Sequence, residues 1–141
     1  VAEIDREISI PLLHIVDATA AEIKKTGLKK VGLLGTRFTM EQEFYKGRLR
    51  ERHGIEALAP EKEDRELVHR VIMDELSRGI VSRESRNAYW RVIDKLARQG
   101  AEGVILGCTE IPLLVQAKPG RVPLFDTTEI HARAAVDLAL G

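Results

Sequence analysis

Short runs of apolar residues alternate along the chain with longer segments whose apolar positions recur at helical spacing. Short apolar runs are typical of strands covered on both faces, and the helical spacing is typical of amphipathic helices. The runs predict strands at residues 10–15, 30–35, 55–58, 103–107 and 122–126. The periodic segments predict helices at residues 18–27, 40–54, 63–78, 83–99, 110–117 and 127–140. Strands that alternate with helices favour right-handed crossovers, so the predicted fold class is α/β, a parallel sheet flanked by helices.

Polar residues and glycines indicate where some of these elements begin and end. Asp17 or Thr19 is expected to cap the helix at 18–27, because a side-chain oxygen there accepts from free N–H groups of the first turn. Gly27 is expected to end that helix in a left-handed conformation.

The amphipathic helices also predict which side chains form the core. The helix at 83–99 is expected to bury Tyr89, Val92, Ile93 and Leu96. Trp90, the only tryptophan, is predicted to pack beside them. By contrast, His53 and His69 are predicted to be solvated helix positions.

Composition narrows the classes of partner. The 141 residues suit one domain, and 44% of them are hydrophobic and 31% charged, as in globular proteins generally. The 22 basic residues balance 22 acidic ones, which favours neither nucleic acid nor an anionic membrane as a partner. No apolar run approaches the roughly 20 residues of a membrane helix. A single cysteine excludes an internal disulfide within these residues, which fits the reducing cytoplasm. The four histidines are scattered without the spacing of metal ligands, so we expect no bound metal.

The only cysteine, Cys108, follows the predicted strand at 103–107 in the sequence GVILGCTEI. A thiol at a strand's carboxyl end faces the unpaired N–H groups and positive dipole end of the next helix. We therefore expect the Cys108 thiol to have a lowered pKa and to form a reactive thiolate. Alternatively, Cys108 is a small buried hydrophobe, as free cysteines often are. The local pattern leaves both interpretations open.

Three segments carry a more specific signal: KVGLLGTRFTMEQEFY, GAEGVILGCTEIPLLV and VPLFDTTEIHARAAVDLAL. Together they resemble the aspartate/glutamate racemase family, and its aspartate racemase branch in particular. The resemblance implies a racemase without PLP or another cofactor, which interconverts L- and D-aspartate, or glutamate, by proton transfer between two cysteines. It assigns Cys108 the role of the second cysteine. The first belongs to a motif resembling Cys-Asn-Thr, which this sequence does not contain.

Family members build their site between two similar α/β domains, so the resemblance implies one such domain and part of the other. Residues 1–29 are expected to be the end of the N-terminal domain and a crossover helix. Residues 30–120 are expected to form the C-terminal α/β domain that carries Cys108, and residues 121–141 a final strand and helix that return to the N-terminal domain. The active site of the chain is then incomplete. The final helix is apolar around most of its circumference, which suits docking on the absent domain or on a second copy in a homodimer.

The same resemblance implies contacts with a small amino-acid substrate. Thr36, Thr39 and Thr109 match positions around that substrate, where hydroxyl groups donate to the α-carboxylate and stabilise developing negative charge. A substrate with two carboxylates also favours an arginine, because its fork of donors fits a carboxylate. Arg37 and Arg78 lie in predicted turns and are the candidates.

Two further residues are expected to support these contacts. Glu110 stands where the glutamate racemases have a histidine, which favours the aspartate branch. It either orients the thiol or a substrate ammonium, or it is a first-turn acid favoured by the helix dipole. His131 in the final helix, and His14, are expected to lie behind the groups that touch the substrate.

Two other functions stay open at this point. A cofactor-independent decarboxylase or a hydantoin racemase relative also uses a strand-end cysteine, and a decarboxylase needs no second one. A non-catalytic amino-acid-binding homologue keeps the binding groups without proton transfer. The residue at the position of the first cysteine discriminates among them.

Overall fold

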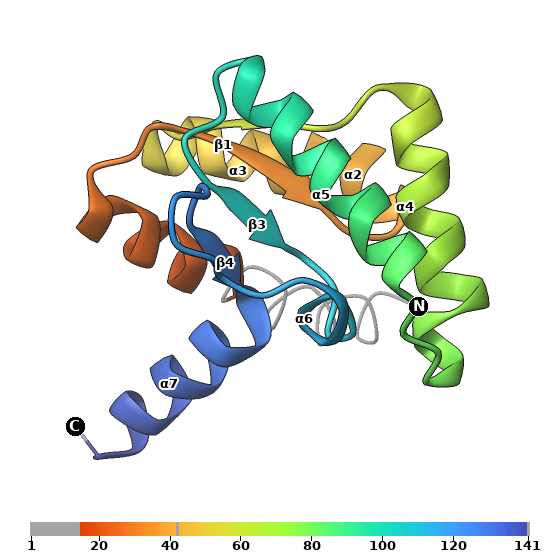
Figure 1. Cartoon of the computed structure of the whole chain (residues 1–141). Coiled ribbons are helices and arrows are strands. Elements are labelled where there is room, and N and C mark those ends of the chain that lie inside the picture. The colour runs from red at the N-terminus through yellow and green to blue at the C-terminus, as the bar shows by residue number, and fades with distance from the viewer. Residues whose placement is uncertain (1–14, 42, 141) are drawn as a thin grey trace, which may run out of the picture.

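The computed structural model describes residues 15–41 and 43–140, and within them four parallel strands form one sheet (Figure 1). The strands are β1 (Lys30–Leu34), β2 (Glu56–Leu58), β3 (Val104–Leu106) and β4 (Leu124–Asp126), in the spatial order β2-β1-β3-β4. Leu33 lies in register with Ile105, which in turn lies in register with Phe125. The predicted fold class, an α/β parallel sheet flanked by helices, is confirmed.

Helices cover both faces of this sheet. The helix at residues 15–26 and α3 (Glu43–His53) pack on one face, whereas α4 (Lys62–Asp74) and α5 (Arg83–Arg98) pack on the other (Figure 1). The shorter elements are α2 (Arg37–Glu41), the 3-10 helix η1 (Leu76–Arg78) and α6 (Ile111–Leu114). The last helix, α7 (Thr127–Leu140), follows β4 directly and projects away from the sheet.

The alternation of side chains along the central strands assigns each one to one of two cores. Val31, Leu33 and Ile105 pack toward α3. Leu34 and Leu106 pack toward α4 and α5. Full burial of an aliphatic side chain of this size contributes about 1.5–3 kcal/mol. Both faces of the sheet are therefore covered, which is why the strands are continuous apolar runs in the sequence.

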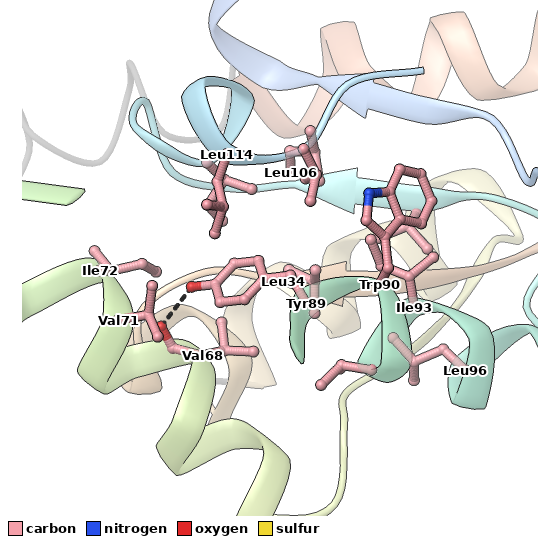
Figure 2. Close-up of a cluster of buried hydrophobic side chains, with 14 of the residues drawn as sticks. Leu34, Val68, Val71, Ile72, Tyr89, Trp90, Ile93, Leu96, Leu106 and Leu114 are labelled. Atoms are coloured by element: carbon pink, nitrogen blue, oxygen red, sulfur yellow. Dashed lines mark hydrogen bonds between the residues drawn. The ribbon is translucent and has the colours of Figure 1, made fainter. Parts of the chain in front are cut away.

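The core on the α4 and α5 side is tied together by Tyr89 (Figure 2). Its side chain is fully buried, and its hydroxyl donates to the backbone carbonyl oxygen of Val68 at 2.6 Å. This bond joins α5 to α4, and burial holds the pKa of Tyr89 well above its ordinary value. The predicted inward positions Val92, Ile93 and Leu96 are buried as well.

Trp90 closes the edge of the same core. Its side chain is 5% exposed, and the Nζ of Lys118 and the Cζ of Arg121 lie 5.2 and 5.1 Å from the centre of its ring. Cations at this distance are attracted to the face of an indole. Arg121 also pairs with Asp94 on α5 at 2.7 Å. The predicted packing role of Trp90 is confirmed, and its ring holds the segment between α6 and β4 against α5.

On the opposite side of the sheet, Asp17 joins the helix at 15–26 to α3. Its carboxylate accepts from Nε and Nη2 of Arg48 at 2.9 and 2.8 Å and lies 2.8 Å from Nε2 of His53. The Arg48 guanidinium holds the pKa of Asp17 well below its ordinary value. The predicted capping role of Asp17 or Thr19 is wrong, because both residues lie inside the helix, and His53 is bonded rather than simply solvated.

The end of that helix is as the sequence predicts, whereas its beginning is not. Gly27 follows the last helical residue with φ of 77°, the left-handed conformation expected of a helix stop. Of the strand predicted at 10–15, residue 15 is helical and residues 10–14 lie outside the described residues.

Two other predicted helices change length for local reasons. The helix predicted at 63–78 breaks at Glu75, whose carboxylate accepts from the hydroxyls of Ser82 and Ser85 at 3.3 and 2.6 Å at the start of α5. The helix predicted at 110–117 shortens to α6, because the Leu114 carbonyl accepts from Nε of Arg86 at 2.7 Å instead of continuing the helical ladder.

Two buried tyrosines give a matched test of this packing. We expect Tyr89→Phe to lower the free energy of unfolding by about 1 kcal/mol, the usual net contribution of a buried hydrogen bond. Tyr45→Phe is the control, since the Tyr45 hydroxyl has no hydrogen-bond partner among the described residues, and we expect it to cost less. Urea unfolding of the two variants measures both values. Equal losses contradict the assignment of the Tyr89 bond.

Candidate active site

Three strand ends meet at one edge of the sheet. β1 is followed by Gly35 and Thr36, β3 by Gly107 and Cys108, and β4 by Thr127. Parallel strands present their carboxyl ends at the same edge, and ligands of open α/β sheets bind there. This edge is the candidate site.

The ends of β1 and β3 approach each other closely. The N–H of Gly107 donates to the carbonyl oxygen of Leu34 at 2.7 Å. A Cβ at position 107 would lie 2.9 Å from that same oxygen, and a Cβ at Gly35 would lie 3.1 Å from the side chain of Thr39. A larger residue at either position would therefore displace the turn after β1.

The turn predicted to hold Arg37 is instead the first turn of α2. The Thr36 carbonyl accepts from the N–H of Met40 at 3.0 Å, and the Thr36 hydroxyl accepts from the N–H of Thr39 at 3.4 Å. The two threonine hydroxyl oxygens lie 3.3 Å apart. The N–H of Arg37 donates to Nδ1 of His69, on α4, at 2.9 Å. The prediction of His69 as a solvated position therefore needs correction, because its ring is bonded to this turn.

The Cys108 thiol donates to Oε2 of Glu110 at 2.8 Å. Burial raises the pKa of Cys108 to about 11 and the carboxylate adds to the rise, while backbone N–H groups of Thr109 and Glu110 lower it by less. The thiol, and after it Thr109, in turn holds the pKa of Glu110 below its ordinary value. The stable form of the pair is therefore a thiol and a carboxylate.

The predicted lowering of the Cys108 pKa is wrong. The backbone N–H groups act in the expected direction, but α6 has only four residues and Glu110 precedes it. Burial and an adjacent negative charge outweigh those N–H groups. The predicted role of Glu110 in orienting the thiol agrees with the observed contact.

A cavity of about 250 Å³ lies at this edge of the sheet. Its lining combines hydroxyl groups from all three strand ends with residues from the helix at 15–26, α3 and α7. The lining residues are Ile15, Thr39, Tyr45, Gly107, Thr109, Thr127, Thr128 and His131.

Tyr45 is a buried polar residue of the cavity wall, and its side-chain pKa is shifted. It is 8% exposed, and burial raises its pKa to about 12. The Thr19 side chain lowers the pKa of Tyr45, but by less than burial raises it. The Thr19 hydroxyl donates its proton to the Ile15 carbonyl at 2.8 Å. Among the described residues, no group lies in hydrogen-bond geometry with the Tyr45 hydroxyl.

The structure brings some of the predicted site residues together at the cavity. Thr39, Thr109 and His131 line it, and Thr36 is joined to Thr39. Cys108 lies between two lining residues, with its half-buried side chain against the core on the α4 and α5 side.

The two predicted arginines are not part of the cavity lining. Arg37 and Arg78 are exposed, the first at the start of α2 and the second at the end of η1. Sequence reasoning missed Tyr45, Thr127 and Thr128 as lining residues. The threonines carry a signal that could have found them, since they follow β4 as Thr36 follows β1, whereas Tyr45 has no local signal within its helix.

Larger hollows lie elsewhere on the molecule but lack comparable chemistry. One of about 420 Å³ adjoins β2 and α3, and one of about 510 Å³ adjoins α4 and α5. Neither is lined by a strand-end hydroxyl or by a sequence neighbour of Cys108, so we place the site at the smaller cavity. Across residues 15–41 and 43–140, no three His, Cys, Asp or Glu side chains gather where they could hold a metal ion. None of the helices in this part of the chain is both long and apolar enough to cross a membrane.

The fold is that of a known protein family. The profile described as Asp/Glu/Hydantoin racemase matches residues 1–135. The chain belongs to this family, and the resemblance found in the sequence is confirmed.

Solved structures and a curated relative agree with this assignment. A candidate Asp/Glu racemase from Yersinia pestis is 61% identical with a TM-score of 0.87, over 92% of this chain and 56% of that one. An aspartate racemase homologue from Pyrococcus horikoshii is 41% identical with a TM-score of 0.82, over 90% of this chain and 55% of that one. The broad specificity amino-acid racemase RacX of Bacillus subtilis is 23% identical, over 99% of this chain and 59% of the relative. The chain thus spans little more than half the length of these relatives.

The thiol–carboxylate pair predicts how Cys108 titrates. In Glu110→Gln we expect the pKa of Cys108 to fall below about 11, because the negative charge is removed. It should stay above the ordinary value of 9.0, because burial, the larger cause, is unchanged. Ultraviolet absorbance of the thiolate against pH measures this when the curve of each protein's Cys108→Ser counterpart is subtracted, which removes tyrosinate and any other thiol.

Glu63→Gln is the matched control, because Glu63 is an exposed acid in the first turn of α4. It should leave the titration unchanged. An unaltered Cys108 titration in Glu110→Gln would show that the carboxylate does not hold the thiol.

Proposed function

We propose that the full-length protein containing this chain is a PLP-independent racemase that interconverts L- and D-aspartate, with glutamate as the alternative substrate. The observation that carries the proposal is the Cys108 thiol, held by Glu110 at the strand-end edge beside a cavity walled by threonine hydroxyls. Membership of the racemase family supports the reaction class. The likeness to an aspartate racemase homologue supports the choice of aspartate.

Cys108 acts as an acid in one direction of this reaction and as a base in the other. As a thiol it delivers a proton to Cα of a carbanion-like intermediate, and in the reverse direction its thiolate removes that proton. Burial and the contact with Glu110 keep Cys108 protonated, and the thiol is the form that delivers the proton.

Inversion at Cα requires a second proton-transfer group on the opposite face of the substrate. The 141 residues contain one cysteine, so we assign this role to the cysteine of a Cys-Asn-Thr-like motif elsewhere in the full-length protein. Both thiols must stay reduced to exchange protons. This places the proposed activity in the cytoplasm.

The threonine hydroxyls provide the electrostatic part of the proposal. Charge that develops at Cα spreads into the α-carboxylate, where fixed donors stabilise it most. Thr39 and Thr109 line the cavity and are the donors we assign, with Thr36 holding Thr39 in place. For the side-chain carboxylate of aspartate we assign Arg37, which directly follows Thr36, and Arg78 as the second candidate.

A cofactor-independent decarboxylase is the second candidate function. Protonation of a carbanion after loss of CO₂ needs one thiol only, and Cys108 can supply it. Release of CO₂ from a substituted malonate, abolished by Cys108→Ser, would support this function over racemisation.

Proton exchange at Cα tests the racemase directly. We expect the full-length protein in heavy water to erase the proton NMR signal of Cα–H in both L- and D-aspartate. We expect Cys108→Ser to abolish this exchange for the one enantiomer whose α-proton Cys108 removes. Chiral analysis of the L-aspartate samples should show D-aspartate accumulating only with the unsubstituted protein.

The parallel experiment with L-glutamate decides between the two substrates, since the faster exchange identifies the preferred one. Persistence of the Cα–H signal with both amino acids would refute the racemase proposal. Exchange of both enantiomers at the original rate in Cys108→Ser would refute the role of Cys108 alone.

A further inference from the structure

His69 makes a hydrogen bond whose chemistry is fixed by its partner. A backbone N–H can only donate, so Nδ1 of His69 must accept from Arg37 with its lone pair, at 2.9 Å. In the neutral ring that makes this bond, the proton therefore lies on Nε2. The sequence offers no hint of this contact, because the two residues lie 32 positions apart on different elements.

The accepting side of this bond is held firmly in place. His69 directly follows Val68, which is fully buried and whose carbonyl accepts from the Tyr89 hydroxyl at 2.6 Å. Figure 2 shows this bond pinning α4 against α5 at Val68. The imidazole therefore extends from a point of α4 that cannot shift without breaking the buried bond.

The donor of this bond, the N–H of Arg37, belongs to a segment that reaches the cavity. Arg37 lies between Thr36 and Thr39 in the turn after β1. The hydroxyl oxygens of these two threonines are 3.3 Å apart. The methyl group of Thr39 would lie 3.4 Å from a Cβ at Gly107, the residue before Cys108. Thr39 also lines the cavity. The His69 bond thus fixes the segment that brings both threonines to the strand-end edge.

We propose that His69 is a positioning residue that holds the Thr36–Thr39 turn against the end of β3 and so sets substrate affinity. It is not part of the cavity lining and acts through the N–H of Arg37. This inference rests on the proposed function for its effect on substrate, whereas its effect on the turn is independent of any activity.

Two substitutions distinguish the effect of the hydrogen-bond acceptor of His69 from the effect of its ring shape. His69→Phe keeps a planar ring but has no lone pair. His69→Asn places a carbonyl oxygen at the same number of bonds from Cα as Nδ1, so it can still accept. We expect His69→Phe to accelerate hydrogen exchange at the Arg37 amide and to shift the amide resonances of Thr36 and Thr39. We expect His69→Asn to preserve both.

Kinetics of aspartate racemisation by the same full-length variants test the effect on substrate. We expect KM to rise about threefold to tenfold in His69→Phe, the range of a single lost hydrogen bond, with a smaller change in kcat. His69→Asn should stay within about twofold of the original KM. Partial unfolding, by contrast, lowers kcat through the active fraction and leaves KM unchanged.

Each outcome decides a different point. An Arg37 amide that exchanges at the same rate in His69→Phe overturns the proposal, as does His69→Asn behaving like His69→Phe. Altered exchange with unchanged KM overturns the effect on substrate. If the unsubstituted protein shows no racemase activity, the proposed function fails, and the amide measurements alone decide whether His69 positions the turn.

Discussion

The candidate site depends on the close approach of two backbone segments at the ends of β1 and β3. A hydrogen bond of 2.7 Å between Gly107 and the carbonyl of Leu34 extends the pairing of the two strands past their last regular residues. This contact leaves no room for a side chain at position 107. It brings the threonine turn after β1 beside the residue that precedes Cys108, so the thiol and the hydroxyls share one edge because the backbones touch.

Both layers of helices contribute to this one edge. From one face, the helix at 15–26 and α3 supply Ile15 and Tyr45 to the cavity wall. Asp17 braces these two helices through its bidentate pair with Arg48. From the other face, α4 reaches the turn after β1 through His69. A parallel sheet with both faces covered thus gives a small site support from two independent cores.

The pKa of Cys108 is set by competition between groups that favour the thiolate and groups that favour the thiol. Two backbone N–H groups favour the thiolate, but burial and the Glu110 carboxylate favour the thiol, and the second pair prevails. The length of the following helix matters here, because four residues of α6 align few peptide dipoles. A protonated thiol beside a cavity lined with threonine hydroxyls can give up a proton, as the proposed racemisation requires.

The sequence by itself determined the fold class, most strands and long helices, the buried face of α5 and the position of Cys108 after a strand. These features depend on local periodicity and on motifs within a few residues, which the chain carries wherever it lies in space. Only the tertiary structure decided the direction of the Cys108 pKa shift, the contact of His69 with Arg37, and the place of Tyr45 in the cavity wall. Asp17 shows the difference clearly, since its polar side chain suits a helix cap locally but binds Arg48, 31 residues away. Burial and long-range contacts depend on which elements pack together, and no local pattern contains that information.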